Sequence, residues 1–136
     1  MMIAAIANVV NRLLKIPKGM KTGKFLISNR RNGEFQFSLK DQNDQEVLAS
    51  EGFSSKNSCM AIIHLIKNKC NNECTFDCQT SDRGQFYFDL LSSNGYLICR
   101  SGMYNQREER DDSIETVRLI APDAIIDDQV KIKEYN

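Results

Sequence analysis

The feature that most constrains the fold is an internal repeat, because residues 24–121 match themselves at a fixed offset of 51 without a gap. The paired identities are Phe25 and Phe76, Gly33 and Gly84, Phe35 and Phe86, Phe37 and Phe88, Leu39 and Leu90, Asn43 and Asn94, Ser50 and Ser101, and Ile63 and Ile114. Two copies of one supersecondary unit explain this match. Residues that both copies keep therefore indicate architecture, whereas residues that one copy alone carries are candidates for function.

Length and charge narrow the class of protein. A chain of 136 residues can bury the core of one domain without metal or disulfide staples. Its 18 basic and 18 acidic residues give a net charge of zero, so no overall field attracts nucleic acid. The five cysteines are an odd number and the start does not resemble a secretory signal, which favours reduced thiols in the cytoplasm. No run approaches the roughly 20 apolar residues that span a bilayer.

The first 21 residues predict a basic amphipathic leader helix. Apolar residues follow helical spacing up to Pro17–Gly19, and every charge as far as Lys24 is positive. This helix could be an extra packing element or a helix that contacts a membrane surface or a partner. The natural start could also be Met20, directly before the repeat.

Each repeat predicts three strands and a helix. In copy one, period-two alternation is broken by turns at Arg31–Gly33 and Asp41–Asp44, and a helix follows from Ser54 and Ser55 to about Asn68. In copy two, Asn105 and Glu108 are expected to cap a helix that begins near Asn105. We assign repeat one to residues 24–70 and repeat two to residues 75–121, within a domain at 22–128 and before a tail at 129–136.

One βββα unit has too small an apolar face to fold alone, so the two should share a sheet. The predicted fold class is α+β, with a single antiparallel six-stranded sheet and two helices packed on one face. Six phenylalanines should dominate its core, namely Phe25, Phe35, Phe37, Phe76, Phe86 and Phe88. The expected inward stripes of the helices are Cys59, Ile62, Ile63 and Ile66, and Ile114, Val117 and Ile120 or Ala121.

Four motifs resemble those of the YegP-like family of small bacterial proteins. They are Lys24-Phe25, residues 33–39 (GEFQFSL), residues 48–56 (LASEGFSSK) and residues 121–124 (APDA). The resemblance covers most of residues 22–128. It implies a single sheet of two βββα units with exchanged C-terminal helices, in tandem monomers or in dimers of single repeats, and it implies no defined biochemical role. Copy two departs from the pattern, since Asn105-Gln106-Arg107 replaces Ser-Ser-Lys.

Comparison of the two copies leaves few residues that could be catalytic. Cys70, Cys74 and Cys78 are regularly spaced, but Cys78 aligns with Ile27, an apolar strand position, and Cys99 aligns with Leu48 in the same way. The single histidine, His64, lies off the inward stripe of its helix, where we expect it to be solvated. We therefore expect no metal, no cofactor and no enzymatic activity. Tyr87 takes an outward position and hints at a contact surface.

The helix starts carry the one functional hypothesis that the sequence supports. Lys56 and Arg107 put a cation in the first turn of each helix, where the helix dipole disfavours it. Together with Ser54, Ser55 and Asn105, these cations could bind an anion at the amino end of each helix. Alternatively, they extend into solvent or pair with Glu51, Glu108 or a neighbouring strand.

These observations favour a small, non-enzymatic cytoplasmic module that binds or interacts with a partner. The alternative is weak binding of nucleic acid or of nucleotide phosphates by the two cations. A small hydrolase is least favoured, because a catalytic constellation is missing from the sequence. The expected partner is a small anionic ligand or another protein. We expect a monomer whose membrane contact, if any, is limited to residues 1–19.

Overall fold

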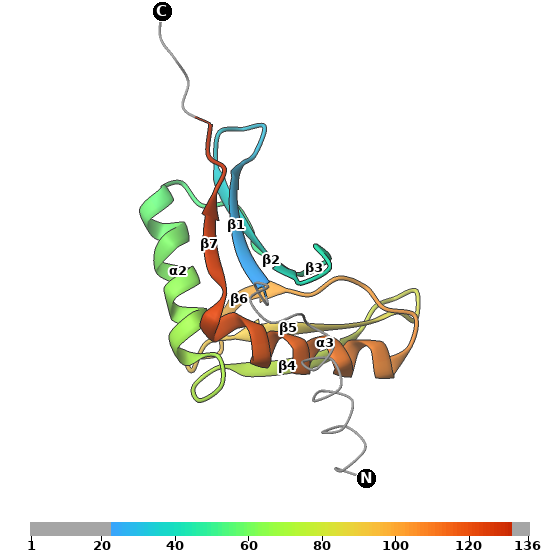
Figure 1. Cartoon of the computed structure of the whole chain (residues 1–136). Coiled ribbons are helices and arrows are strands. Elements are labelled where there is room, and N and C mark those ends of the chain that lie inside the picture. Colours follow the sequence, from blue (N-terminus) through green and yellow to red (C-terminus); the bar gives the residue numbers. More distant parts are fainter. Residues whose placement is uncertain (1–22, 132–136) are drawn as a thin grey trace, which may run out of the picture.

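The computed structural model describes residues 23–131, so the predicted leader helix lies outside the described residues (Figure 1). The first repeat forms β1 (Gly23–Asn29), β2 (Phe35–Asp41), β3 (Glu46–Ala49) and α2 (Lys56–Lys69). The second repeat forms β4 (Thr75–Thr80), β5 (Phe86–Leu91), β6 (Leu97–Arg100) and α3 (Arg107–Ile120). A short 3-10 helix, η1 (Ala121–Asp123), then leads into β7 (Ile125–Asp128).

Local sequence explains the hairpins. Buried and half-buried residues alternate along β1, as expected for a strand with one face on a core. The turns need left-handed backbone, which glycine adopts without steric cost. Gly33 and Gly84 serve this purpose at equivalent positions, with φ of 86° and 77°. At the next turn, Gly95 in copy two has φ 84°, whereas its counterpart Asp44 has φ 63°.

The prediction of a six-stranded antiparallel sheet is wrong in strand number and in strand direction, because the sheet of residues 23–131 has seven strands and is mixed. Its strand order is β4-β5-β6-β3-β2-β1-β7. The two repeats join where β3 and β6 pair antiparallel at Ala49 and Arg100. The added strand, β7, runs parallel to β1, with Phe25 opposite Ile126 and Ile27 opposite Asp128. Figure 1 shows β7 alongside β1 at one end of the sheet.

Both helices begin at equivalent positions of the repeat. The N-cap of α2 is Ser55, whose Oγ accepts a hydrogen bond of 3.1 Å from the backbone N–H of Ser58. The N-cap of α3 is Gln106, and the side chain of Glu109 accepts from its backbone N–H at 3.1 Å. The predicted capping pair of Asn105 and Glu108 is therefore shifted by one residue, since the offset of 51 aligns Gln106 with Ser55.

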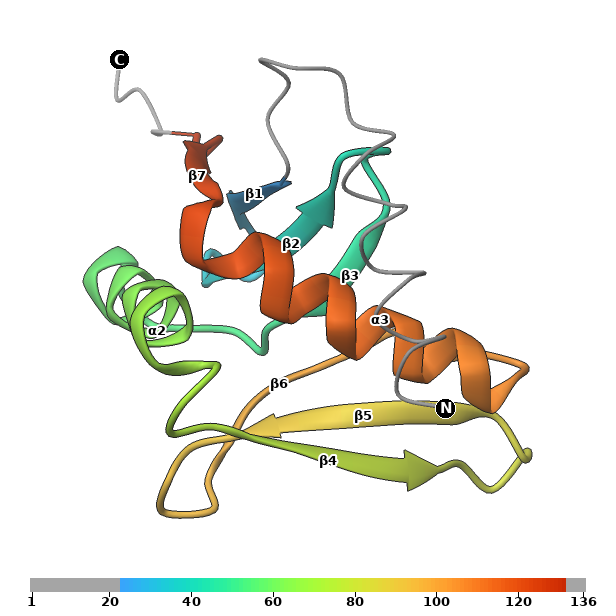
Figure 2. The same cartoon turned by 60° about the horizontal axis from the view of Figure 1, so that its bottom comes forward.

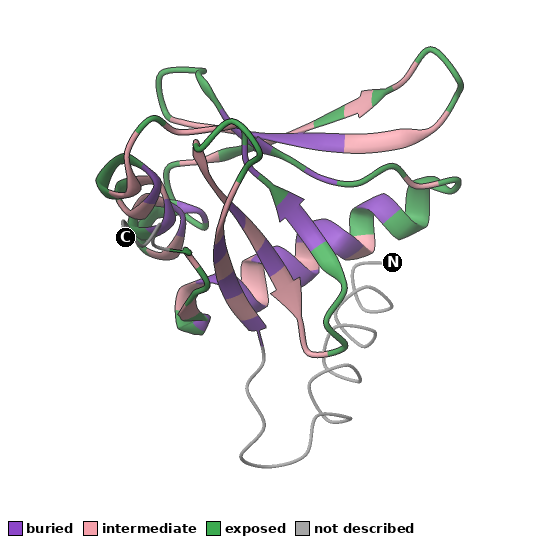
Figure 3. Ribbon diagram, turned by 90° about the horizontal axis from the view of Figure 1, so that it is seen from above, coloured by how far each residue is buried: buried purple, intermediate pink, exposed green. Residues whose placement is uncertain are grey.

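A single core joins the two repeats. Helix α2 contacts β2 of its own repeat, whereas α3 contacts β5 of its own repeat and also β3 of the first repeat. Helix α3 therefore packs on both halves of the sheet, and β7, which follows it, pairs with β1 of the first repeat. Figure 3 shows buried positions on α3 and on the strands beneath it. None of the described helices is long and apolar enough to cross a bilayer.

Three of the six predicted core phenylalanines are fully buried. Phe25, Phe37 and Phe88 are at most 2% exposed, whereas Phe35, Phe76 and Phe86 are half-buried at the ends of the strands. The predicted helix stripes are buried as well, except that Ile62 is half-buried. Of the half-buried rings, Phe35 and Phe76 pack against the buried core from its edge.

Candidate interaction surface

The outer edge of β4 carries backbone groups that no residue among 23–131 pairs with. The N–H of Phe88 donates to Ser101 Oγ at 2.9 Å, and its carbonyl accepts from the N–H of Ser101 at 3.0 Å. Both backbone groups of Phe88 therefore point toward β6. Cys78 is the partner of Phe88 in the antiparallel ladder, so its N–H and carbonyl point the other way, out of the sheet. Because this direction alternates every two residues along a strand, the N–H and carbonyl groups of Phe76 and Thr80 also point out of the sheet.

The equivalent edge of β1 is covered by β7. The carbonyl of Ile27, the counterpart of Cys78, accepts a hydrogen bond of 2.8 Å from the N–H of Gln129. Asn29 Oδ1 accepts another, also 2.8 Å, from the N–H of Lys131. No strand among residues 23–131 occupies the corresponding position beside β4, which forms the other end of the sheet (Figure 2).

Side-chain burial differs in the same way between the two edges. Phe25 and Ile27 on β1 are 0% exposed. Their counterparts on β4 are less covered, since Phe76 is half-buried and Cys78 is exposed. The expectation that Cys78 would be a buried apolar position is therefore wrong. Cys78 does lie opposite the buried Phe88, but no strand among the described residues lies outside β4 to cover it.

Lys56, the first of the two predicted anion-binding cations, is engaged by β7. Its Nζ forms an ion pair with Oδ2 of Asp128. The hydrogen bond from Lys56, together with one from the backbone N–H of Val130, lowers the pKa of Asp128 below its ordinary value. The helix-dipole cost of Lys56 is thus offset by an acid that arrives from the last strand.

Arg107, the equivalent cation of copy two, has no such partner among residues 23–131. Its guanidinium Cζ lies 5.5 Å from the ring centroid of Phe86. The described residues place no carboxylate within 4 Å of its nitrogens. Arg110, which lies over the same ring at 5.7 Å, pairs instead with Asp111 at 3.1 Å. An acid in the place of Asp128 is therefore what copy two lacks.

The remaining predicted anion-site residues do not converge. Ser55 is occupied as the cap of α2, and its hydroxyl donates to Ser58 Oγ at 2.9 Å. Ser54 is exposed, and Asn105 Oδ1 accepts from Gln85 Nε2 at 3.3 Å. Anion binding at the helix starts stays a prediction, and in copy one an anion would have to compete with Asp128.

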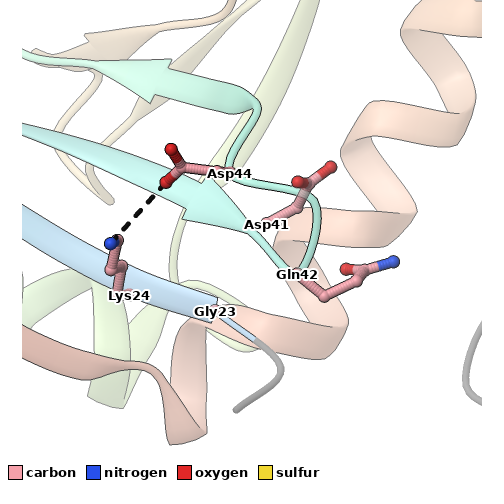
Figure 4. Close-up of a pocket in the computed structure, with 5 residues that line it drawn as sticks. All are labelled: Gly23, Lys24, Asp41, Gln42 and Asp44. Carbon is pink, nitrogen blue, oxygen red and sulfur yellow. Dashed lines mark ion pairs between the residues drawn. The ribbon is translucent and has the colours of Figure 1, made fainter. Parts of the chain in front are cut away.

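A shallow hollow of about 270 Å³ was not predicted from the sequence (Figure 4). Its lining residues are Gly23, Lys24, Asp41, Gln42 and Asp44. Lys24 Nζ lies 3.6 Å from Asp44 and 3.8 Å from Asp127, while one oxygen of Asp41 accepts from the backbone N–H groups of two residues of the following turn. Lys24 is thus engaged by two acids and Asp41 by its own turn, so the charged groups of the hollow are largely occupied by neighbouring residues.

Tyr87 lies in a closed cluster on the outward side of β5. Arg100 donates to both oxygens of Asp89, at 2.6 and 3.1 Å, and its Cζ lies 4.9 Å from the ring centroid of Tyr87. The hydrogen bond to Asp89 raises the pKa of Arg100. Copy one carries Gln36, Ser38 and Ala49 at these three positions. The cluster is specific to copy two, but its charges are neutralised internally.

The cysteines do not gather around the histidine. Cys70 is buried, Cys74 is half-buried, and His64 is exposed on α2. Burial raises the pKa of the Cys70 thiol, which disfavours the thiolate that a metal would need. Across residues 23–131, no group of three or more His, Cys, Asp or Glu side chains is arranged to hold a metal ion.

Comparison with known proteins places both repeats in one family. The family described as a domain of unknown function (DUF1508) matches residues 31–77 and 81–128. A UPF0339 protein encoded upstream of the ptx operon of Stutzerimonas stutzeri is 35% identical over 76% of this chain and 93% of its own length. The UPF0339 protein YegP of Escherichia coli K12 is 31% identical over 71% of this chain and 87% of its own length.

Two solved structures share the fold. The solution structure of YegP from E. coli superimposes with a TM-score of 0.76 at 27% identity, over 83% of this chain and 97% of YegP. The structure of a UPF0339 protein from Shewanella oneidensis gives a TM-score of 0.75 at 27% identity, over 80% and 92% of the two chains. These matches confirm the resemblance to the YegP-like family.

Proposed function

Because the chain belongs to the DUF1508 family, whose description assigns no function, we propose from its own geometry that it is a non-enzymatic interaction module that binds a polypeptide partner at the outer edge of β4. The observation that carries this proposal is the difference between the two ends of the sheet. One end is closed by β7, whereas at the other end Phe76, Cys78 and Thr80 present backbone groups that are unpaired within the described part of the chain.

An open strand edge favours a polypeptide over a small anion. Its row of N–H and carbonyl groups is satisfied by the backbone of another strand, and peptide-binding domains use this mode of recognition. The half-buried ring of Phe76 adds apolar surface that an incoming strand would cover. An anion offers neither the alternating donors and acceptors nor the apolar contact.

We also propose that the protein is cytoplasmic and that it is a monomer when the partner is absent. All five cysteines are unpaired, which suits a reducing compartment. A monomer leaves the edge of β4 available to the partner.

Selection from a random peptide library tests this proposal. The full chain and its Cys78→Pro variant are used as parallel baits, because proline removes one outward N–H and is tolerated at the open side of an edge strand. Thr80→Pro is the second edge variant, and thermal melting checks that each variant folds. We expect peptides that are enriched on the full chain and lost on both variants. Enrichment that is equal on all three baits, or no enrichment on any, would refute the proposal.

A further inference from the structure

The two halves of the sheet are related by a pseudo-twofold operation that exchanges β1 with β4, β2 with β5, β3 with β6 and α2 with α3. Strand β7 is the one described strand without a counterpart under this exchange. Its partners on the first half do have counterparts, because Lys56 corresponds to Arg107, Lys67 to Arg118 and Phe25 to Phe76. The second half therefore retains part of a binding surface for a strand like β7.

The contacts of β7 show what such a strand must carry. Ile126 and Val130 pack against the core, and Asp128 pairs with Lys56 in the first turn of α2. Ile126 and Asp128 alternate along β7, and Val130 follows two residues later, so the three side chains lie on the same side of the segment. At the start of the strand, Lys67 Nζ donates to the carbonyl of Ala124. The inward pattern is thus an apolar residue, an acid and a second apolar residue at every other position.

The second half offers matching groups without an occupant among the described residues. Arg107 lies at the position of Lys56 and lacks an acid within ion-pair distance. Phe76 is half-buried where Phe25 is fully buried, and Arg118 lies 4.4 Å above its ring. In a strand bound to β4 as β7 is bound to β1, an acid at the position of Asp128 would pair with Arg107. An apolar residue at the position of Ile126 would cover Phe76.

We infer that β4 accepts a strand in parallel orientation, as β1 accepts β7, from a partner polypeptide with the pattern apolar-x-acidic-x-apolar, whose carboxylate pairs with Arg107. This inference rests on the proposed function and adds the direction and chemistry of the bound strand. The leader is a poor occupant, because residues 1–22 hold four basic and no acidic residues and would bring like charge to Arg107.

The test uses a capped synthetic peptide with the sequence of residues 124–131, AIIDDQVK, added to the full-length protein labelled for NMR. We expect saturable shifts at the amides of Phe76, Cys78 and Thr80. Arg107→Glu should weaken binding about fivefold, as expected for the loss of a partly exposed ion pair, and a peptide with lysine in place of Asp128 should restore it. Arg31→Glu is the matched control, since it changes the net charge equally on an exposed turn of the first half.

The outcomes separate the inference from the proposed function. Shifts confined to Phe25 and Ile27 would mean that the peptide merely replaces β7, and would overturn the inference. The library selection could also yield peptides that need the β4 edge but lack an acid at the central position of the apolar-x-acidic-x-apolar pattern. That result would overturn the inference and leave the proposed function standing. A dimer that Cys78→Pro converts to a monomer would assign the edge to a second copy and would refute both. Absence of shifts at β4 together with a failed selection would also refute both.

Discussion

At the scale of single residues, the repeat provides matched pairs whose surroundings differ. Phe25 and Phe76 occupy the same place in the two copies, but Phe25 is fully buried and Phe76 is half-buried. We expect Phe25→Ala to lower the free energy of unfolding by about 3–5 kcal/mol, as for a buried aromatic ring. Phe76→Ala should cost less than half as much. Chemical denaturation measures both, and equal losses would show that the end of the sheet at β4 is covered in solution.

The thiols should differ in reactivity for the same reason. Burial raises the pKa of Cys59 to about 11 and also raises that of Cys99, so neither forms much thiolate near pH 8. Cys78 is exposed at the open edge. We expect iodoacetamide to alkylate Cys78 at least tenfold faster than Cys59 in the native protein, as peptide mass spectrometry would measure. Similar rates at the two sites in folded protein would contradict the burial described above.

The ion pair between Lys56 and Asp128 predicts a dependence of stability on pH. Because the pKa of Asp128 is lowered in the folded state, its ionised form stabilises the fold at pH values above the ordinary carboxyl pKa of about 3.9. That stabilisation is lost as the pH falls through the lowered pKa. At pH 7 the wild type should therefore unfold at higher denaturant concentration than Asp128→Asn, and the difference should vanish near pH 2. A difference that persists at pH 2 would exclude this ion pair as its source.

At the scale of secondary-structure elements, β7 is the part that the sequence did not reveal. Residues 125–128 are two isoleucines followed by two aspartates. The equivalent segment of the first repeat lies inside the chain and has a different sequence, so the repeat does not indicate that residues 125–128 form a strand. Their counterparts at residues 74–77 enter β4, the first strand of the second repeat. Strand β4 lies beside β5, but the equivalent place beside β2 in the first half is already occupied by β1. The strand after α3 therefore pairs with the outer edge of β1, a tertiary contact that the periodicity of the sequence cannot predict.

Removal of β7 should expose the outer edge of β1 in the first half, as the outer edge of β4 is exposed in the second. We expect a chain that ends at Ala124 to lose roughly 1.5–3 kcal/mol of stability, equivalent to one buried apolar side chain, because Ile126 and Val130 no longer pack on the core. A chain that ends at Lys131 is the control against which the loss is measured. Denaturant unfolding measures both, and an unchanged stability without residues 125–131 would show that β7 is not docked in solution.

At the scale of the whole molecule, the repeat allowed the fold class, the βββα order and the shared core to be predicted, since amphipathic periodicity and size fix them. The proposed binding edge could not be predicted in this way. It arises where the symmetry of the two halves is broken, and the position of Cys78 at an open edge depends on which strand lies beside it. Aligning Lys56 with Arg107 identified two equivalent cations whose surroundings differ, since Lys56 pairs with Asp128 and Arg107 lies over Phe86, while anion binding by this pair stays a prediction.

The two halves should fold as one unit. Helix α3 packs on β3 of the first repeat, and the strand that follows α3 closes the edge of β1. A fragment that ends at Cys70 lacks both contacts, so we expect it to be unfolded or to associate with a second copy. Thermal unfolding and sedimentation of that fragment test this expectation, which a stable monomer with a sharp transition would contradict.

The most direct test of the central claim is site-resolved amide hydrogen exchange in the unliganded full-length protein. Phe25 and Ile27 on β1 are compared with their counterparts Phe76 and Cys78 on β4, because all four backbones face away from the neighbouring hairpin strand. The account predicts slow exchange at Phe25 and Ile27, whose edge β7 covers, and exchange at least a hundredfold faster at Phe76 and Cys78. Equal protection at the two edges would contradict an open β4, and with it the binding surface proposed for this protein.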